Sequence, residues 1–299
     1  MSTPMSLAEA VVVDRGLAGD RRSAEPGSSG SLHLVVDRVA GRTRIVDLEC
    51  SGPVQVLRCQ YLDAAAPDIA WVTIASPSGG VLQGDRLRIA VEVRAGARLS
   101  LDTQSATRLY RMPVRPARID ARFHVGAGAW LEYVPDPWIP FAGSNTTVDT
   151  VVVVDTTAAA VVGEIVAAGR VARGETFRMT AFHSTLSAIR PSGELLFSDA
   201  TDLVAGEPLD DPGMIGGGAA VGSLHVVALD TDPDTLRASI RDHALPPTHA
   251  GASTLPNDAG MWLRVVAATT AGAMAVVAAG HDSARVAVLG VPLPRSRRV

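Results

Sequence analysis

The 299-residue sequence carries 27 basic and 31 acidic side chains, a net charge of −4, and every basic residue is an arginine. The absence of lysine excludes P-loop nucleotide hydrolases and pyridoxal enzymes, since both require a lysine ammonium or amine. The scattered arginines also lack the clustered positive charge that a nucleic-acid partner requires.

Residues 1–30 show neither the apolar core of a secretion signal nor a strand pattern, and 19–31 is rich in Gly, Ser and Arg. We expect a disordered N-terminal extension over 1–30 and a single β-rich domain over 31–299. Two cysteines, Cys50 and Cys59, are too few for a disulfide framework, and no apolar run reaches the ~20 residues that a membrane span requires. These features predict a cytoplasmic protein without a membrane segment.

Alternation of apolar and polar residues dominates the chain after Ser31 and predicts half-buried strands. Residues 86–94 alternate, pass through a Gly-containing turn at 95–97 and alternate again to 103, which predicts a hairpin. Further strands are predicted at 32–39, 43–48, 54–62, 69–75, 178–189, 195–200 and 224–229. The fold is therefore expected to be mainly β.

A sequence repeat indicates how these strands are arranged. The stretch Val93–Leu99 is echoed 32 residues further along, at Val125–Leu131, and a weaker copy lies at Thr157–Glu164. Repeats of fixed spacing are typical of stacked layers in which neighbouring copies bury each other's apolar faces. We predict coiled or solenoid-like antiparallel β-sheets.

Helices are predicted to be few and short, and to lie mainly near the C-terminus. A helical turn is expected at 106–111, a helix at 232–241 opened by Asp232 and a proline, and a helix at 271–279. The segment 201–222 is rich in Gly, Pro and Asp, which predicts a mobile loop.

Carboxylates are the candidate functional groups. Glu132 and Glu164 occupy equivalent places in successive repeats, and stacked strands ~4.8 Å apart would bring them together. Paired carboxylates can bind a divalent cation or hydrolyse a glycosidic bond. The equally weighted alternative is that each glutamate forms a buried ion pair with Arg170 or Arg173.

Four motifs follow one another between Val39 and Asp199. They are Gly79-Gly80-Val-Leu-Gln-Gly84-Asp85-Arg-Leu87, Thr103-Gln104-Ser-Ala-Thr-Arg108-Leu-Tyr110-Arg111, Leu131-Glu132-Tyr-Val-Pro135 leading to Ile139-Pro-Phe141, and Gly169-Arg170-Val-Ala-Arg173-Gly174-Glu175-Thr-Phe177. In this order and spacing they resemble the UreD family of urease accessory proteins, also called UreH. Arg108 stands where that family usually has lysine, and Gln83 stands where it commonly has glycine.

The resemblance implies a maturation factor that is not an enzyme, with a coiled, mostly antiparallel β fold and a few helices. Such a protein acts as a scaffold or chaperone for nickel insertion into apo-urease. Its implied partners are UreF, the apo-urease subunits and, through UreF, the nickel-carrying GTPase UreG. No cofactor is expected to be held stably, although nickel can pass through.

The same resemblance implies an internal passage for nickel lined by carboxylates, for which the candidates are Asp85, Glu132, Glu164 and Glu175. Several weak oxygen ligands suit transit, because a His or Cys cage would retain nickel, so we predict no stable metal site.

The remaining motif residues are expected to have structural roles. Gly84 and Gly174 would permit turns, and Thr103 and Gln104 would cap the helical turn. The other motif residues singled out are Tyr110, Arg170 and Arg173. Trp130, Trp138 and Phe141 are candidates either for an aromatic partner anchor or for core packing.

Two hypotheses from other classes remain. A β-solenoid carbohydrate-active enzyme would use Glu132 and Glu164 with their carboxyl groups ~5–9 Å apart across a cleft. A purely structural β-solenoid module would need none of these carboxylates for function.

Overall fold

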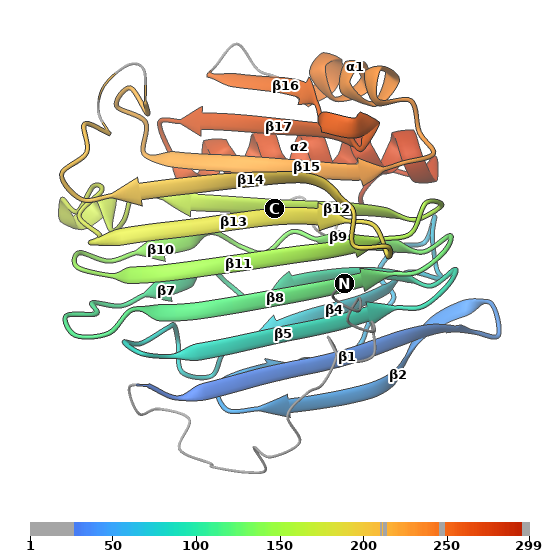
Figure 1. The fold of residues 1–299 in the computed structure, drawn as a ribbon, viewed down its shortest axis with the longest axis horizontal. Helices are drawn as coiled ribbons and strands as arrows, with labels where there is room; N and C mark the ends of the chain where they lie inside the picture. Colours follow the sequence, from blue (N-terminus) through green and yellow to red (C-terminus); the bar gives the residue numbers. More distant parts are fainter. Residues whose placement is uncertain (1–26, 210, 212–213, 245–248, 295–299) are drawn as a thin grey trace, which may run out of the picture.

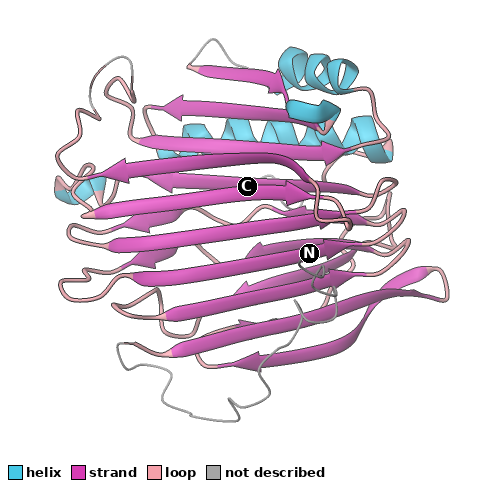
Figure 2. Ribbon diagram, viewed as in Figure 1, coloured by secondary structure: helices cyan, strands magenta, loops and turns pink. Residues whose placement is uncertain are grey.

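The computed structural model describes residues 27–294, with gaps at 210, 212–213 and 245–248. Two β-sheets pack face to face, and helices cover the outer side of one of them (Figure 1, Figure 2). Most of the predicted N-terminal extension, residues 1–26, lies outside the described residues. The first described strand begins at Ser29, slightly before the predicted start of the domain. The prediction of a mainly β, solenoid-like fold is confirmed.

Within the described residues, sheet A has seven strands and sheet B has ten. In spatial order, sheet A consists of β14 (Leu195–Val204), β13 (Ala181–Ile189), β11 (Asn145–Val154), β8 (Ala117–Val125), β5 (Arg86–Val93), β1 (Ser29–Val39) and β2 (Arg42–Ser51). Sheet B consists of β16 (Ala250–Thr254), β17 (Gly260–Ala267), β15 (Ala220–Ala228), β12 (Ala159–Ala167), β9 (Trp130–Tyr133), β6 (Arg98–Thr103), β4 (Ala70–Ala75) and β3 (Gln55–Val56), with β7 (Thr107–Leu109) and β10 (Trp138–Pro140) attached to its side. The helices are α1 (Pro233–Ala244), α2 (Thr270–Leu289) and the 3-10 turns η1 (Val171–Arg173) and η2 (Pro256–Asp258).

Each coil of the chain contributes one strand to each sheet, so the central strands of both sheets are parallel. β5 of sheet A leads into β6 of sheet B, β8 into β9, and β11 into β12. The turn at 95–97 carries the chain from one sheet to the other, and Val93 and Leu99 meet in the core between them. The predicted hairpin is wrong, because alternation alone does not show whether successive strands pair with each other or with neighbouring coils.

Neighbouring coils align at two different spacings. β6 pairs with β9 with Leu99 opposite Leu131, which confirms the 32-residue repeat. The next coil is three residues shorter, since Val161 of β12 lies opposite Glu132 of β9. Side chains alternate between the faces of a strand, so this odd shift turns Glu164 toward the face opposite to that of Glu132.

Antiparallel strands close the stack at both ends. β2 runs antiparallel to β1 at one end of sheet A, and β14 runs antiparallel to β13 at the other. Sheet B continues past β12 through β15, β17 and β16, all paired antiparallel. The predicted antiparallel arrangement therefore holds at the ends of the stack, while its body is parallel.

Two main apolar cores hold the layers together. The core between the sheets is built from aliphatic side chains of successive coils, such as Leu32, Leu99 and Leu131. The second core lies between the outer face of sheet B and α2, where Val277 packs with Leu263. In Figure 1, α2 lies behind β15 and β17, and α1 lies beside β16.

The helix predictions are partly right. α1 begins after Asp232, whose Oδ2 accepts a hydrogen bond of 2.9 Å from the Thr235 amide, as the capping pattern predicts. α2 includes the predicted 271–279 and extends well beyond it. The helical turn predicted at 106–111 is wrong, since β7 occupies that segment and pairs with β10. The loop predicted at 201–222 is shorter, because β14 and β15 extend into it from both sides.

Candidate functional site

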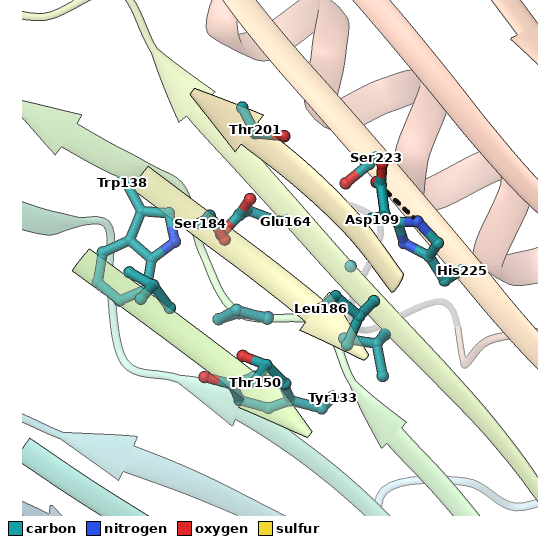
Figure 3. Close-up of a pocket in the computed structure, with 14 residues that line it drawn as sticks. Tyr133, Trp138, Thr150, Glu164, Ser184, Leu186, Asp199, Thr201, Ser223 and His225 are labelled. Carbon is teal, nitrogen blue, oxygen red and sulfur yellow. Dashed lines mark hydrogen bonds and ion pairs between the residues drawn. The ribbon is translucent and has the colours of Figure 1, made fainter. Parts of the chain in front are cut away.

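A small cavity between the two sheets gathers polar side chains from both of them (Figure 3). Its volume is about 30 Å³, enough for a water molecule or a small ion. The polar side chains that line it are Tyr133, Thr150, Glu164, Ser184, Asp199, Thr201, Ser223 and His225. Most of these groups carry oxygen, and they come from six different strands.

Glu164 is one of the two carboxylates at this cavity. It points from β12 toward sheet A, where the Ser184 hydroxyl of β13 donates a hydrogen bond of 2.8 Å to its Oε1. Burial raises the pKa of Glu164 to about 7, and the negative charge of Asp199 adds to that effect, against the lowering effect of hydrogen bonds from Ser184 and Trp138. The carboxyl therefore exchanges its proton near neutral pH.

Asp199 is the second carboxylate and belongs to an ion-paired group. Its Oδ2 lies 3.0 Å from Nε2 of His225 and 2.5 Å from Nη2 of Arg264. Burial alone would raise the pKa of Asp199, but these two partners hold it below its ordinary value. The His225 ring is itself stacked on Phe197, with centroids 5.5 Å apart. Asp199 thus stays ionised at a pH at which Glu164 takes up a proton.

Sequence reasoning missed Asp199, His225 and Arg264. Asp199 and His225 lie within strands that alternation predicts, and they stand at inward positions among apolar neighbours. An inward-facing polar residue in a predicted strand is the signal that was available. Their mutual contact was not predictable, because it joins strands of two sheets whose pairing the sequence does not show.

Glu132 lies elsewhere, buried between sheet B and α2. Its Oε1 accepts a hydrogen bond of 2.7 Å from the Trp130 indole and lies 3.2 Å from Nε of Arg285, and its Oε2 lies 3.5 Å from His281 Nε2. Burial would raise the pKa of Glu132, but His281, Arg285 and Trp130 together lower it. The structure therefore does not bring Glu132 and Glu164 together, and Glu132 has partners other than Arg170 or Arg173.

The Arg285 side chain extends this buried group to a third segment. Its Nη2 donates a hydrogen bond of 2.5 Å to Asp63, whose other oxygen accepts from the Ala65 and Ala66 amides. Arg285 and Asp63 are almost fully buried, at 0% and 3% of side-chain exposure. These contacts fasten α2 to the segment before β4, which is a structural role.

Asp85 acts as a backbone cap at the start of β5. It accepts hydrogen bonds of 3.1 Å from the Ser28 amide and 2.8 Å from the Leu82 amide. Burial raises its pKa despite these bonds. Gly84 just before it has φ +74°, a conformation that favours glycine at this turn.

Glu175 lies at the surface and is bound by Arg170. The two side chains form a bidentate pair, and the Ala142 amide donates a further hydrogen bond of 3.3 Å to Glu175. The pairing with Arg170 is the main reason that the pKa of Glu175 is lowered. Gly174, with φ +73°, ends the η1 turn and presents Glu175. For this glutamate the ion-pair alternative describes the arrangement.

The four sequence motifs meet around this pair. Arg170 lies over the Phe141 ring at 4.2 Å, and Tyr110 meets the same ring edge-on with centroids 5.1 Å apart. Gly80 lies against Tyr110 so closely that a Cβ there would come within 2.8 Å of that ring. The segments that resemble UreD are separated in the sequence and are thus brought together in space.

Thr103 and Gln104 do not cap a helical turn, because a bend at 104–105 leads from β6 toward β7 and no helix follows. Thr103 Oγ1 instead accepts a hydrogen bond of 2.8 Å from the Asp136 amide, and the Gln104 amide donates to the Ile74 carbonyl. Of the three aromatic candidates, Trp130 and Trp138 are buried in cores, whereas Phe141 is partly exposed. The four predicted passage carboxylates therefore occupy four separate places, and Glu164 is the one at the inter-sheet cavity.

In the part of the chain that the structure describes, no three His, Cys, Asp or Glu side chains are grouped as a metal site requires. Cys50 and Cys59 are both free thiols. None of the described helices combines the length and the apolar character needed to cross a membrane.

These features define a class of protein: a two-sheet, solenoid-like β protein. It has a small cavity lined by ionisable side chains between its sheets and a surface where the four sequence motifs meet. The family model of the UreD urease accessory protein matches residues 28–299. The chain belongs to the UreD family.

Relatives from three organisms are similar to this chain over almost its whole length. A urease accessory protein UreD of Haloarcula marismortui is 36% identical over 91% of this chain and 91% of its own. UreD 2 of Streptomyces griseus is 33% identical, covering 91% and 94%, and UreD of Yersinia pseudotuberculosis is 32% identical, covering 91% and 87%.

Proposed function

We propose that this chain is a urease accessory protein that acts as a scaffold or chaperone during nickel insertion into apo-urease. The observation that carries the proposal is the match to the UreD family over residues 28–299, reinforced by relatives with 31–36% identity that bear the same name. Its partners are the apo-urease subunits and UreF, with UreG reached through UreF. The site of action is the cytoplasm.

The chain is proposed to be non-catalytic. The carbohydrate-enzyme alternative needs Glu132 and Glu164 on two sides of one cleft, whereas the register of β9 and β12 turns them to opposite faces of sheet B. The inter-sheet cavity of about 30 Å³ also has no room for a sugar ring.

Nickel is the cargo in this proposal and is not held as a cofactor. The inter-sheet cavity offers carboxylate and hydroxyl oxygens, with Glu164 and Asp199 as the charged groups. A Glu164 carboxyl with a pKa of about 7 can release its proton when a cation arrives and take it back when the cation leaves. Weak oxygen ligation of this kind favours passage over retention.

Co-expression tests the proposal. Urease is purified from cells that express its subunits and accessory proteins with the wild-type chain, without it, with Glu164→Gln, or with Glu194→Gln as an exposed control. We expect urease nickel content and activity to depend on the chain, to fall with Glu164→Gln and to be unchanged with Glu194→Gln.

The outcomes separate the two parts of the proposal. Equal nickel content with and without the chain would overturn the accessory role. Wild-type nickel content with Glu164→Gln would leave that role intact and overturn passage through the inter-sheet cavity.

A further inference from the structure

An open depression lies where the four motifs meet. Its residues follow the ends of β7 and β10, two strands labelled in Figure 1. We call it the arginine depression; it is lined by Tyr110, Arg111, Phe141, Ala142, Gly143 and Arg170. Phe141 is its centre, since Tyr110 and Arg170 both contact that ring. The arginine depression is separate from the inter-sheet cavity and from the buried group around Glu132 and Arg285.

The charge around the arginine depression is unbalanced. Arg108, Arg111, Arg173 and Arg178 are all exposed, and within the described residues none of them forms an ion pair. Arg178 is held beside the depression by the hydrogen bond of 2.8 Å from the Gly143 amide to its carbonyl. The neighbouring carboxylate of Glu175 is already bound by Arg170.

This imbalance contrasts with strand β8 on the outer face of sheet A. There Arg118 lies 2.8 Å from Asp120, and Arg122 lies 3.0 Å from Asp149. The chain as a whole carries a net charge of −4. Its positive charge is therefore local, and it lies where arginines have no carboxylate partner. Such a surface attracts carboxylates.

The backbone of the depression is fixed before any partner arrives. The Tyr110 amide donates to Val81 at 3.0 Å, the Phe141 amide donates to Leu109 at 2.9 Å, and the Met112 amide donates to Gly143 at 2.9 Å. A preformed surface loses little conformational freedom on binding. Arginine and tyrosine are also the side chains that most often dominate protein interfaces.

We infer that the arginine depression binds an acidic segment of a partner protein. Carboxylates of that segment pair with Arg111 and Arg178, and an apolar side chain between them packs on Phe141 and Tyr110. Arginine suits this role because its guanidinium binds a carboxylate through two parallel hydrogen bonds. The inference rests on the proposed function in one respect only, namely the identity of the maturation partner that supplies the segment.

An acidic protein segment fits better than a nucleic acid. Nucleic-acid binding draws most of its strength from many phosphate contacts along a basic stripe, whereas this surface is compact and belongs to an acidic chain. The aromatic centre between the arginines matches an alternation of acidic and apolar side chains.

The first test uses the full chain and a defined probe. A short fluorescein-labelled peptide of alternating Glu and Phe residues is titrated with the wild type, with Arg111→Glu/Arg178→Glu and with Arg86→Glu/Arg88→Glu. The last variant is the matched control, because Arg86 and Arg88 on β5 are also exposed, form no ion pair among the described residues and undergo the same charge change. We expect about tenfold or greater weakening for Arg111→Glu/Arg178→Glu and a much smaller change for the control.

Two outcomes would overturn the inference. One is equal weakening by both double variants, which would indicate attraction by net charge alone. The other is tighter binding of a single-stranded DNA oligonucleotide than of the Glu-Phe peptide, which would identify a nucleic-acid surface.

The second test asks which partner is bound. Apo-urease and UreF are each captured with the same three chains, and we expect Arg111→Glu/Arg178→Glu to lose one of them while the control retains both. If the wild-type chain captures neither, the proposed function fails while the peptide result still decides the inference. If Arg111→Glu/Arg178→Glu captures both as the wild type does, the depression is not the docking surface.

Discussion

Nε of Arg285 lies 3.2 Å from Oε1 of Glu132, and both side chains are buried, with exposed fractions of 0% and 1%. Arg285 belongs to α2 and Glu132 to β9, so the contact joins the C-terminal helix to the middle of sheet B. Asp63 and His281 complete the group. A buried charge whose partner is removed costs more than the pair itself contributes, so the fold should be sensitive to substitutions within this group.

Replacing Arg285 with methionine should destabilise the chain strongly. The substitution keeps most of the side-chain volume but leaves Glu132 and Asp63 without their cation, for an expected loss of about 3–5 kcal/mol. Urea unfolding followed by circular dichroism measures the change. The exposed Arg86→Met serves as the control, and equal stability of the two variants would contradict the structural role of the group.

The stability of the chain should carry a pH signature from Glu164. Its pKa is about 7 in the folded chain and 4.5 ordinarily, so the folded state binds the extra proton between these values. The contribution is fully present below the ordinary pKa and is lost as the pH rises through about 7. The loss is at most about 3 kcal/mol, since each pKa unit corresponds to about 1.4 kcal/mol.

Glu164→Gln removes this titration and keeps an acceptor for Ser184. We expect the unfolding free energy of the wild type to fall relative to that of the variant as the pH rises from 5 to 8. Urea unfolding at each pH measures this difference. A difference that stays constant over this range would show that Glu164 does not take up a proton in the folded chain.

Gly80→Ala should disturb the surface where the motifs meet. A Cβ at this position would lie 2.4 Å from the Arg108 carbonyl oxygen and 2.8 Å from the Tyr110 ring, so backbone must shift. We expect a loss of about 2 kcal/mol or more, larger than for Gly128→Ala. Gly128 is the matched control, because it has φ +63° but no atom within 4 Å of its Cβ. Thermal unfolding of both variants makes the comparison.

Glu175→Ala should separate function from folding. The Arg170–Glu175 pair is near the surface, so its loss should change the unfolding free energy little. Arg170 would lose the bidentate partner that holds it over Phe141, and we expect weaker urease activation in the co-expression assay. Full activation by a folded Glu175→Ala chain would favour the purely structural alternative.

The repeat was the most informative feature of the sequence. The spacing of Val93–Leu99 and Val125–Leu131 predicted strands in register, and Leu99 does lie opposite Leu131. Direction was not predictable, because the Gly-containing turn at 95–97 suits both a hairpin and a crossing between sheets. That choice depends on which distant strands are available as partners.

The site was less predictable than the fold. The place of Glu164 in a repeat identified it as a candidate. The prediction that Glu132 lies beside it is wrong, because one coil is three residues shorter. Its actual neighbours, Ser184 and Asp199, come from sheet A, and no local pattern links them to β12. Contacts across two sheets require the full register of both.

The reversal of strand direction at the two ends of the stack limits how this architecture can change in length. An added coil needs parallel neighbours on both sides, and along the two main sheet orders of the described residues such neighbours lie between β1 and β13 in sheet A and between β4 and β12 in sheet B. Duplication of a coil would therefore be accommodated inside the stack and rejected at its ends. The antiparallel strands act as terminal caps that set the number of turns.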